Sequence, residues 1–144
     1  MFRVGNVLKT ITSGYPYRNG NNGDPHSGID ITAPSGTTFD APTYSVGSGT
    51  VYEVRDNVDG YGKLVILSIG SYKVYYGHLN SISVSENDPV TVETKVGHVG
   101  NTGSITPAPT PNDPTAGAHL HFEVRNSSGA TLNPTSFYPS GVFS

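Results

Sequence analysis

One short segment, residues 118–125, alternates apolar and polar residues with a period of two. Successive side chains of a β-strand point to opposite faces, so the pattern predicts a strand with one apolar and one polar face. The apolar face carries Leu120, Phe122 and Val124, and the polar face carries His119, His121, Glu123 and Arg125. Two imidazoles on one face can converge on a metal ion or can both face solvent. The rest of the chain must decide between these two interpretations.

The composition is that of an all-β protein rich in loops. The 144 residues include 18 glycines and 11 prolines, and only 34% of them are hydrophobic. No window of a dozen residues shows the 3.6-residue period of an amphipathic helix. Apolar runs such as 64–67 argue against disorder. A chain of this length can bury one core, so we predict a single compact domain of antiparallel sheets.

Charge and hydropathy exclude two classes of partner. The net charge is −3 and only 13% of residues are charged; without a cluster of Lys and Arg, we expect no nucleic-acid binding. No run of about 18 apolar residues is present, so we expect no membrane span. Residues 1–11 lack the pattern of a secretory signal. We therefore expect that a signal was removed, that the chain is part of a larger protein, or that export takes another route.

Strands and loops can be placed by local pattern. The expected strands lie at 37–41, 50–55, 63–69, 72–78 and 96–99, besides the segment 118–125. Gly70 and Ser71 predict a two-residue hairpin turn. Strand 63–69 is apolar on both faces and should therefore be central in its sheet. Two long polar loops are expected at 13–25 and 104–118, and the second contains four prolines, which exclude a central strand.

The chain has no cysteine, so any metal must be held by histidine and carboxylate side chains. His26 and Asp30 lie four residues apart, and Gly28 between them permits a close backbone approach. Such a pair is often structural when it stands alone. Together with one imidazole from the pair at 119 and 121 it gives three ligands, the number that a catalytic zinc ion usually takes from protein.

Two further histidines have less context. His78 ends an expected strand beside Gly77, which again permits close approach; alone it would be read as a satisfied turn histidine. His98 has no partner nearby in the sequence, and we expect it to be structural.

Four short motifs then occur in the order of a known family. They are His-Ser-Gly-Ile-Asp-Ile at 26–31, Tyr-Gly-His-Leu at 76–79, Gly-Asn-Thr-Gly at 100–103 and His-Leu-His-Phe-Glu-Val at 119–124. Their order resembles the lysostaphin/LytM-type zinc metallopeptidases over about residues 12–135. Members of that family cut peptide bonds of bacterial peptidoglycan, in the stem peptide or its cross-bridge. The resemblance implies one peptidase domain over residues 1–144, with long loops forming a groove over a zinc site.

Carried over by position, the resemblance implies one Zn²⁺ ion per chain held by His26, Asp30 and His121, with His78 and His119 as catalytic histidines. The implied reaction is hydrolysis by a metal-activated water. His119 would take the proton of that water and pass it to the leaving amine. His78 would donate to the oxyanion or share the proton transfer, and the sequence leaves these roles open.

Three other residues have two interpretations each. Glu123 shares the polar face of its strand and can orient an imidazole, but a solvent-facing position or a structural ion pair is the expectation we favour. Tyr15 and Tyr17 precede the first motif and either line the groove, where they can donate to the oxyanion, or pack at its rim.

The loop 104–118 departs from the family, in which the corresponding link is usually much shorter. This difference bears on substrate specificity. An active peptidase acting on peptidoglycan peptides outside the cytoplasm, secreted or virion-associated, is the prediction, as a monomer or as part of a larger protein. The alternatives are an inactive binding or activator module, and a phage virion or tail component whose peptidase domain opens the cell wall.

Overall fold

A computed structural model of the chain describes residues 8–19, 22–34 and 36–143. Its elements are β1 (Thr10–Ser13), β2 (Tyr17–Asn19), β3 (Asn22–Pro25), β4 (Ile29–Thr32), β5 (Pro42–Tyr44), β6 (Gly49–Val58), β7 (Gly62–Ile69), β8 (Tyr72–Ile82), β9 (Pro89–Val90), β10 (Lys95–Val99), β11 (Leu120–Arg125), β12 (Thr131–Leu132) and the 3₁₀ helix η1 (Pro134–Phe137). The prediction of an antiparallel all-β fold is confirmed.

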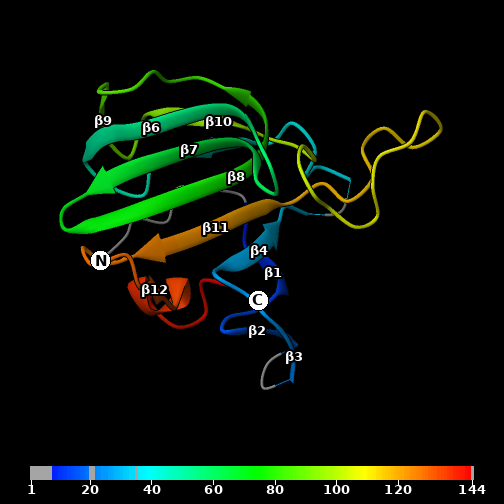
Figure 1. The fold of residues 1–144 in the computed structure, drawn as a ribbon, viewed down its shortest axis with the longest axis horizontal. Coiled ribbons are helices and arrows are strands. Elements are labelled where there is room, and N and C mark those ends of the chain that lie inside the picture. Colours follow the sequence, from blue (N-terminus) through cyan, green and yellow to red (C-terminus); the bar gives the residue numbers. More distant parts are fainter. Residues whose placement is uncertain (1–7, 20–21, 35, 144) are drawn as a thin grey trace.

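The main sheet takes its strands in the order β1-β4-β11-β8-β7-β6-β9, as Figure 1 shows. β10 pairs with both β8 and β5, and β12 pairs with β11. β6, β7 and β8 form two consecutive hairpins, the second through Gly70 and Ser71 as predicted. β7 lies between β6 and β8 and is largely buried, so its central position, expected from its continuous apolar sequence, is also confirmed.

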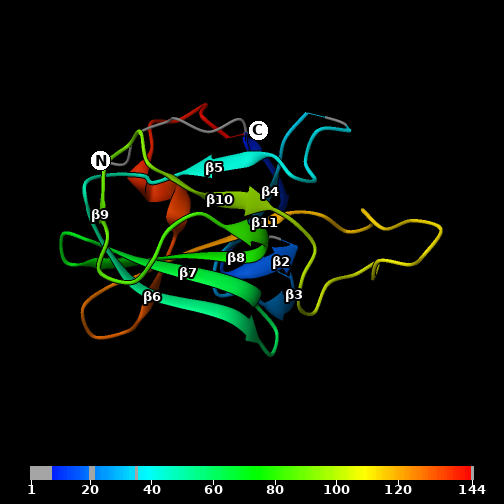
Figure 2. The same cartoon turned by 90° about the horizontal axis from the view of Figure 1, so that it is seen from above.

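The core lies against the inner face of this curved sheet. Strands β4, β6, β7, β8, β9, β10 and β11 contribute fully or nearly fully buried side chains to it, including Ile31, Leu67, Val74, Val99 and Leu120. The pair β5–β10 and the helix η1 lie on this inner side (Figure 2). The apolar face of β11 packs into the core, with Leu120, Phe122 and Val124 all buried. This packing fixes the direction of the opposite face of the same strand.

Two local predictions were wrong. The strand expected at 37–41 is a turn region, and the strand begins only at Pro42. Asp40 has a φ of 67°, which a β-strand does not accommodate. The loop predicted at 13–25 contains a small hairpin, β2–β3. Residues 1–7 lie outside the described residues, and the first strand, β1, begins at Thr10.

The Pro-rich segment 104–118 is an irregular loop, as predicted, and it projects from the body of the fold as an arm (Figures 1 and 2). Residues 106–115 are exposed. The first residue of the arm, Ser104, donates to the Gly60 carbonyl at 2.9 Å, and the arm ends just before His119 and strand β11. In the described residues no helix is long and apolar enough to cross a membrane.

Gly28 marks the closest approach between the 26–30 segment and β11. A Cβ atom at this position would lie 2.3 Å from the carbonyl oxygen of Phe122 and 2.9 Å from the Cα of Glu123. No side chain fits there, so the chain can pass β11 at this distance only with glycine.

We therefore expect Gly28→Ala to lower the free energy of unfolding by about 1–3 kcal/mol, as overpacking usually does. Urea denaturation followed by tyrosine fluorescence measures the change. Gly14→Ala is the matched control, because its new Cβ would meet nothing closer than the Tyr17 carbonyl oxygen at 3.5 Å. Equal stability of the two variants would contradict the close approach.

Candidate active site

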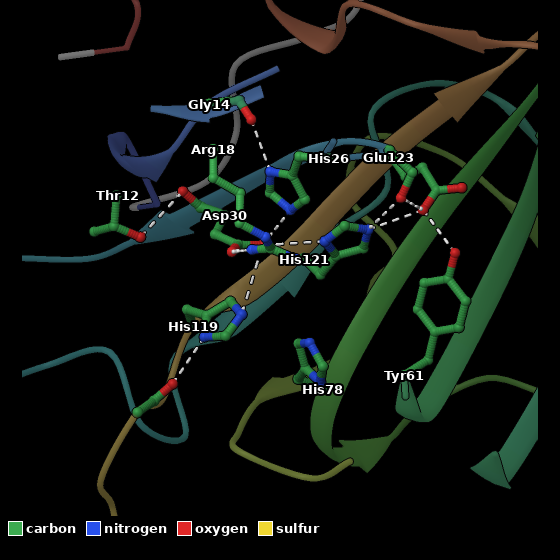
Figure 3. Close-up of polar contacts among 12 residues, drawn as sticks. Thr12, Gly14, Arg18, His26, Asp30, Tyr61, His78, His119, His121 and Glu123 are labelled. Carbon is green, nitrogen blue, oxygen red and sulfur yellow. Dashed lines mark hydrogen bonds and ion pairs between the residues drawn. The ribbon is translucent and has the colours of Figure 1, made fainter. Parts of the chain in front are cut away.

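Strand pairing brings together three residues that are far apart in the sequence. β11 pairs with β4 in a register that sets His121 directly opposite Asp30. His26 lies just before β4 and its Nε2 atom is 3.3 Å from Asp30 Oδ1. His121 Nδ1 is 3.0 Å from the same oxygen. These three buried side chains each offer one ligand atom, and the atoms all lie within 4.8 Å of one another (Figure 3).

The orientation of both imidazoles is set by hydrogen bonds on the side away from Asp30. His26 Nδ1–H donates to the Gly14 carbonyl at 2.7 Å. Its buried Nε2 has no hydrogen-bond partner among the described residues. His121 Nε2–H donates to Glu123 Oε1 at 2.8 Å. Each ring therefore turns its other nitrogen toward the carboxylate, so the three side chains can offer two imidazole nitrogens and one oxygen. This donor set suits a zinc ion, so the residues present fit that metal.

Asp30 is held ionised by its surroundings. Burial alone would raise its pKa, but the neighbouring imidazoles of His121, His26 and His119 outweigh burial, and the pKa lies well below the usual value. The outer oxygen Oδ2 is 3.4 Å from Arg18 Nη1. The carboxylate is thus an anionic ligand whose inner oxygen faces the two imidazoles.

His119 and His78 lie beside this cluster. His119 Nδ1–H donates to the Gly117 carbonyl at 2.8 Å, and its Nε2 is 3.5 Å from Asp30 Oδ1. His78 Nδ1–H donates to the Thr102 carbonyl at 2.7 Å. The two rings meet edge-on, with their centroids 4.7 Å apart. In both rings the hydrogen bond through Nδ1 leaves Nε2 available to a substrate.

His78 has an unusual backbone conformation, with a φ of 62°. Its N–H donates to the Tyr61 carbonyl at 2.7 Å, across an irregularity in the β7–β8 pairing. Strain of this kind is often found at functional sites. Burial, followed by the proximity of His119, lowers the pKa of His78 to about 4, so the imidazole is neutral at neutral pH.

Glu123 combines two of the interpretations that the sequence left open. The favoured one was a solvent-facing position or a structural ion pair, and only its solvent-facing alternative is wrong. The side chain is fully buried and forms both a hydrogen bond with His121 and an ion pair with Arg125. Burial alone would raise the pKa of Glu123, but hydrogen bonds from His121 and its other donors lower it to about 2. Alternation gave the face of the strand but not whether neighbouring segments cover that face.

Three contact residues were missed altogether. They are Ser27 and Tyr61, which donate to Glu123, and Thr102, whose carbonyl accepts from His78. Thr102 belongs to the Gly-Asn-Thr-Gly motif, and Ser27 lies next to His26, so both had a signal nearby. Tyr61, in the β6–β7 turn, had none.

A groove of about 700 Å³ opens beside the cluster. Tyr15 and Tyr17 both line it, as one of their two interpretations predicted. The Tyr15 hydroxyl donates to the Thr131 carbonyl at 3.1 Å, whereas Tyr17 is exposed. His98 is not among the lining residues and lies 2.9 Å from the Ser81 hydroxyl through its Nδ1, which agrees with a structural role.

Comparison with known proteins finds relatives that include peptidoglycan endopeptidases. It is 38% identical over 100 residues to the peptidoglycan DD-endopeptidase ShyB of Vibrio cholerae, which is 69% of this chain and 20% of that protein. A crystal structure of a zinc-containing peptidase from Vibrio cholerae matches with a TM-score of 0.67 and 31% identity, over 91% of this chain and 39% of that one. The catalytic domain of lysostaphin from Staphylococcus simulans matches with a TM-score of 0.69 and 25% identity, over 90% of this chain and 91% of that one.

The chain spans only 20–23% of the length of the first curated relatives that it matches. The model of Peptidase family M23 matches residues 24–134. This range includes strands β4 and β11 and the five candidate residues named from the motifs, which are four histidines and Asp30. Since this match covers well over half of the chain, the protein belongs to peptidase family M23.

Proposed function

We propose that the chain is a zinc metalloendopeptidase that hydrolyses peptide bonds of bacterial peptidoglycan, and that residues 1–144 form one peptidase domain. The observation that carries the proposal is the convergence of His26 Nε2, Asp30 Oδ1 and His121 Nδ1 at the groove, beside two further imidazoles. Relatives named as peptidoglycan DD-endopeptidases support this substrate class. The place of action is then outside the cytoplasm, on the cell wall.

In this proposal His26, Asp30 and His121 hold one zinc ion per chain. When bound at such a site, zinc lowers the pKa of water and polarises the scissile carbonyl. His119 accepts the proton of the attacking water, because its Nδ1–H is committed to Gly117 and its Nε2 faces the cluster. The same nitrogen then returns the proton to the leaving amine.

His78 has a related role in the proposal. Its Nδ1–H is committed to the Thr102 carbonyl, and a pKa of about 4 keeps Nε2 unprotonated at neutral pH. We therefore assign it as an acceptor that shares the proton work with His119, rather than as a donor to the oxyanion. An inactive binding module is not favoured, because all five positions carry residues able to bind metal or transfer protons.

Metal binding gives the first test. We expect the purified wild-type protein to bind about one zinc ion per chain, measured by elemental analysis after dialysis, because three ligand atoms converge. His121→Ala removes a ligand and should lose zinc, whereas His119→Ala should keep it. If both variants retain zinc, the division of roles within the histidine pair is wrong.

Turnover gives the second test. We expect His119→Ala and His78→Ala to lower the rate of peptidoglycan digestion by about 10²–10⁴-fold, the usual contribution of general acid–base groups. His98→Ala is the matched control and should be nearly silent, since His98 lies on the β8–β10 pair with its Nδ1 2.9 Å from the Ser81 hydroxyl rather than beside Asp30. A loss for the control comparable to that for His78→Ala would contradict the assignment of His78 as a catalytic residue.

Digestion of two peptidoglycans with different cross-links, with mass spectrometry of the released termini, identifies the bond that is cleaved.

Removal of the metal gives the third test. A chelator should abolish digestion, and zinc added back should restore it, because the three protein ligands alone have no means of activating water. A metal-free preparation with full activity would overturn the mechanism.

A further inference from the structure

Glu123 is a carboxylate with no access to solvent in the middle of β11. A buried charge is costly unless it is paired and hydrogen-bonded. Here Oε1 accepts from Ser27 Oγ at 2.8 Å, Tyr61 Oη at 2.7 Å and His121 Nε2 at 2.8 Å. Oε2 accepts from Arg125 Nε at 2.5 Å. The donors come from three separate segments of the chain, so several parts of the fold hold this carboxylate in place.

The contact with His121 has a consequence for the ring. A neutral imidazole has one proton and can place it on either nitrogen. Asp30 at Nδ1 and Glu123 at Nε2 are both ionised carboxylates, which only accept hydrogen bonds (Figure 3). A metal ion held by Nδ1 and Asp30 needs the lone pair of Nδ1, and the proton of the neutral ring is then on Nε2, where Glu123 accepts it at 2.8 Å.

His26 reaches the same result by another means. Its proton is held on Nδ1 by the backbone carbonyl of Gly14, which leaves Nε2 for the cluster. His121 lies inside a strand that pairs on both sides, with β4 and with β8. Neighbouring backbone carbonyls are committed to those ladders. The carboxylate of Glu123, two residues along the same face of β11, therefore does for His121 what the Gly14 carbonyl does for His26.

The support for Glu123 is tied to the other ligands. Ser27 lies between His26 and Asp30, so the segment that carries two proposed ligands also holds the carboxylate that orients the third. Arg125, on the same face of β11, compensates the charge and lies over the ring of Tyr75, 5.0 Å from its centroid. This arrangement leaves Glu123 little freedom to turn away from His121.

We propose that Glu123 is a positioning residue that fixes the ring orientation and tautomer of His121, so that its Nδ1 is preformed as a metal ligand. The inference rests on the proposed zinc site and deepens it. Groups that orient a metal ligand in this way usually contribute 10–100-fold to metal affinity.

The experiment compares the zinc affinity of Glu123→Gln and Glu123→Leu with that of the wild type, by competition with a chromophoric chelator. We expect about 10-fold weaker binding for Gln, which keeps one acceptor oxygen but loses the charge, and about 100-fold for Leu, which keeps no acceptor. The order wild type, Gln, Leu is the readout that a merely structural role would not produce. Thermal unfolding of the metal-free variants identifies those that fold, and Glu123→Gln, nearly isosteric, decides the question if the Leu variant does not.

Glu53→Gln is the matched control. Glu53 also pairs with an arginine two residues along its strand, Arg55, but at a partly exposed position on β6. Its zinc affinity should equal that of the wild type. If the wild type binds zinc and Glu123→Gln binds it with the same affinity, the inference about Glu123 is wrong, but the proposed function stands. A wild-type protein that binds no zinc overturns the proposed function, and this inference with it.

Discussion

The register between β4 and β11 is the constraint on which the site depends. It sets His121 opposite Asp30 and at the same time places Ile31 opposite Leu120, both in the core. A slip of one residue would turn every side chain of a strand to the other face. The buried apolar residues therefore fix the register, and the register brings the imidazole to the carboxylate. The same strand register is therefore required both for the stability of the sheet and for the geometry of the site.

A row of four polar side chains, three of them charged and one an imidazole, follows from that pairing. Asp30, His121, Glu123 and Arg125 lie next to one another, each joined to the next by a contact of 3.0 Å or less. His121 thus stands between two carboxylates with different roles. Asp30 turns one oxygen to the same space as the imidazoles, whereas Glu123 faces away from it and is surrounded by donors. Two acids of like charge can be buried close together because His121 lies between them and each also has further polar partners of its own.

The sequence predicted the features that depend on local pattern. Hairpins such as β7–β8 follow from apolar runs and a glycine turn. The five residues that the motifs named as candidates lie close together in the structure. The failures concern long-range packing. Whether the polar face of β11 meets solvent depends on Ser27 and Tyr61, which approach it from distant segments. Gly28 permits that approach, and nothing in the alternation of 118–125 reports it.

The arm at 104–118 shows how a long insertion can adjoin a site without loosening it. Asn101 Nδ2 donates to the carbonyls of Pro114 and Ala116, which ties the returning end of the arm to the motif before it. The next carbonyl, of Gly117, accepts from His119. The residues that orient this imidazole therefore belong to the anchored base of the arm, while the exposed tip contributes none of these contacts. Because extra loop length costs little conformational entropy, the tip can vary while His119 stays in place.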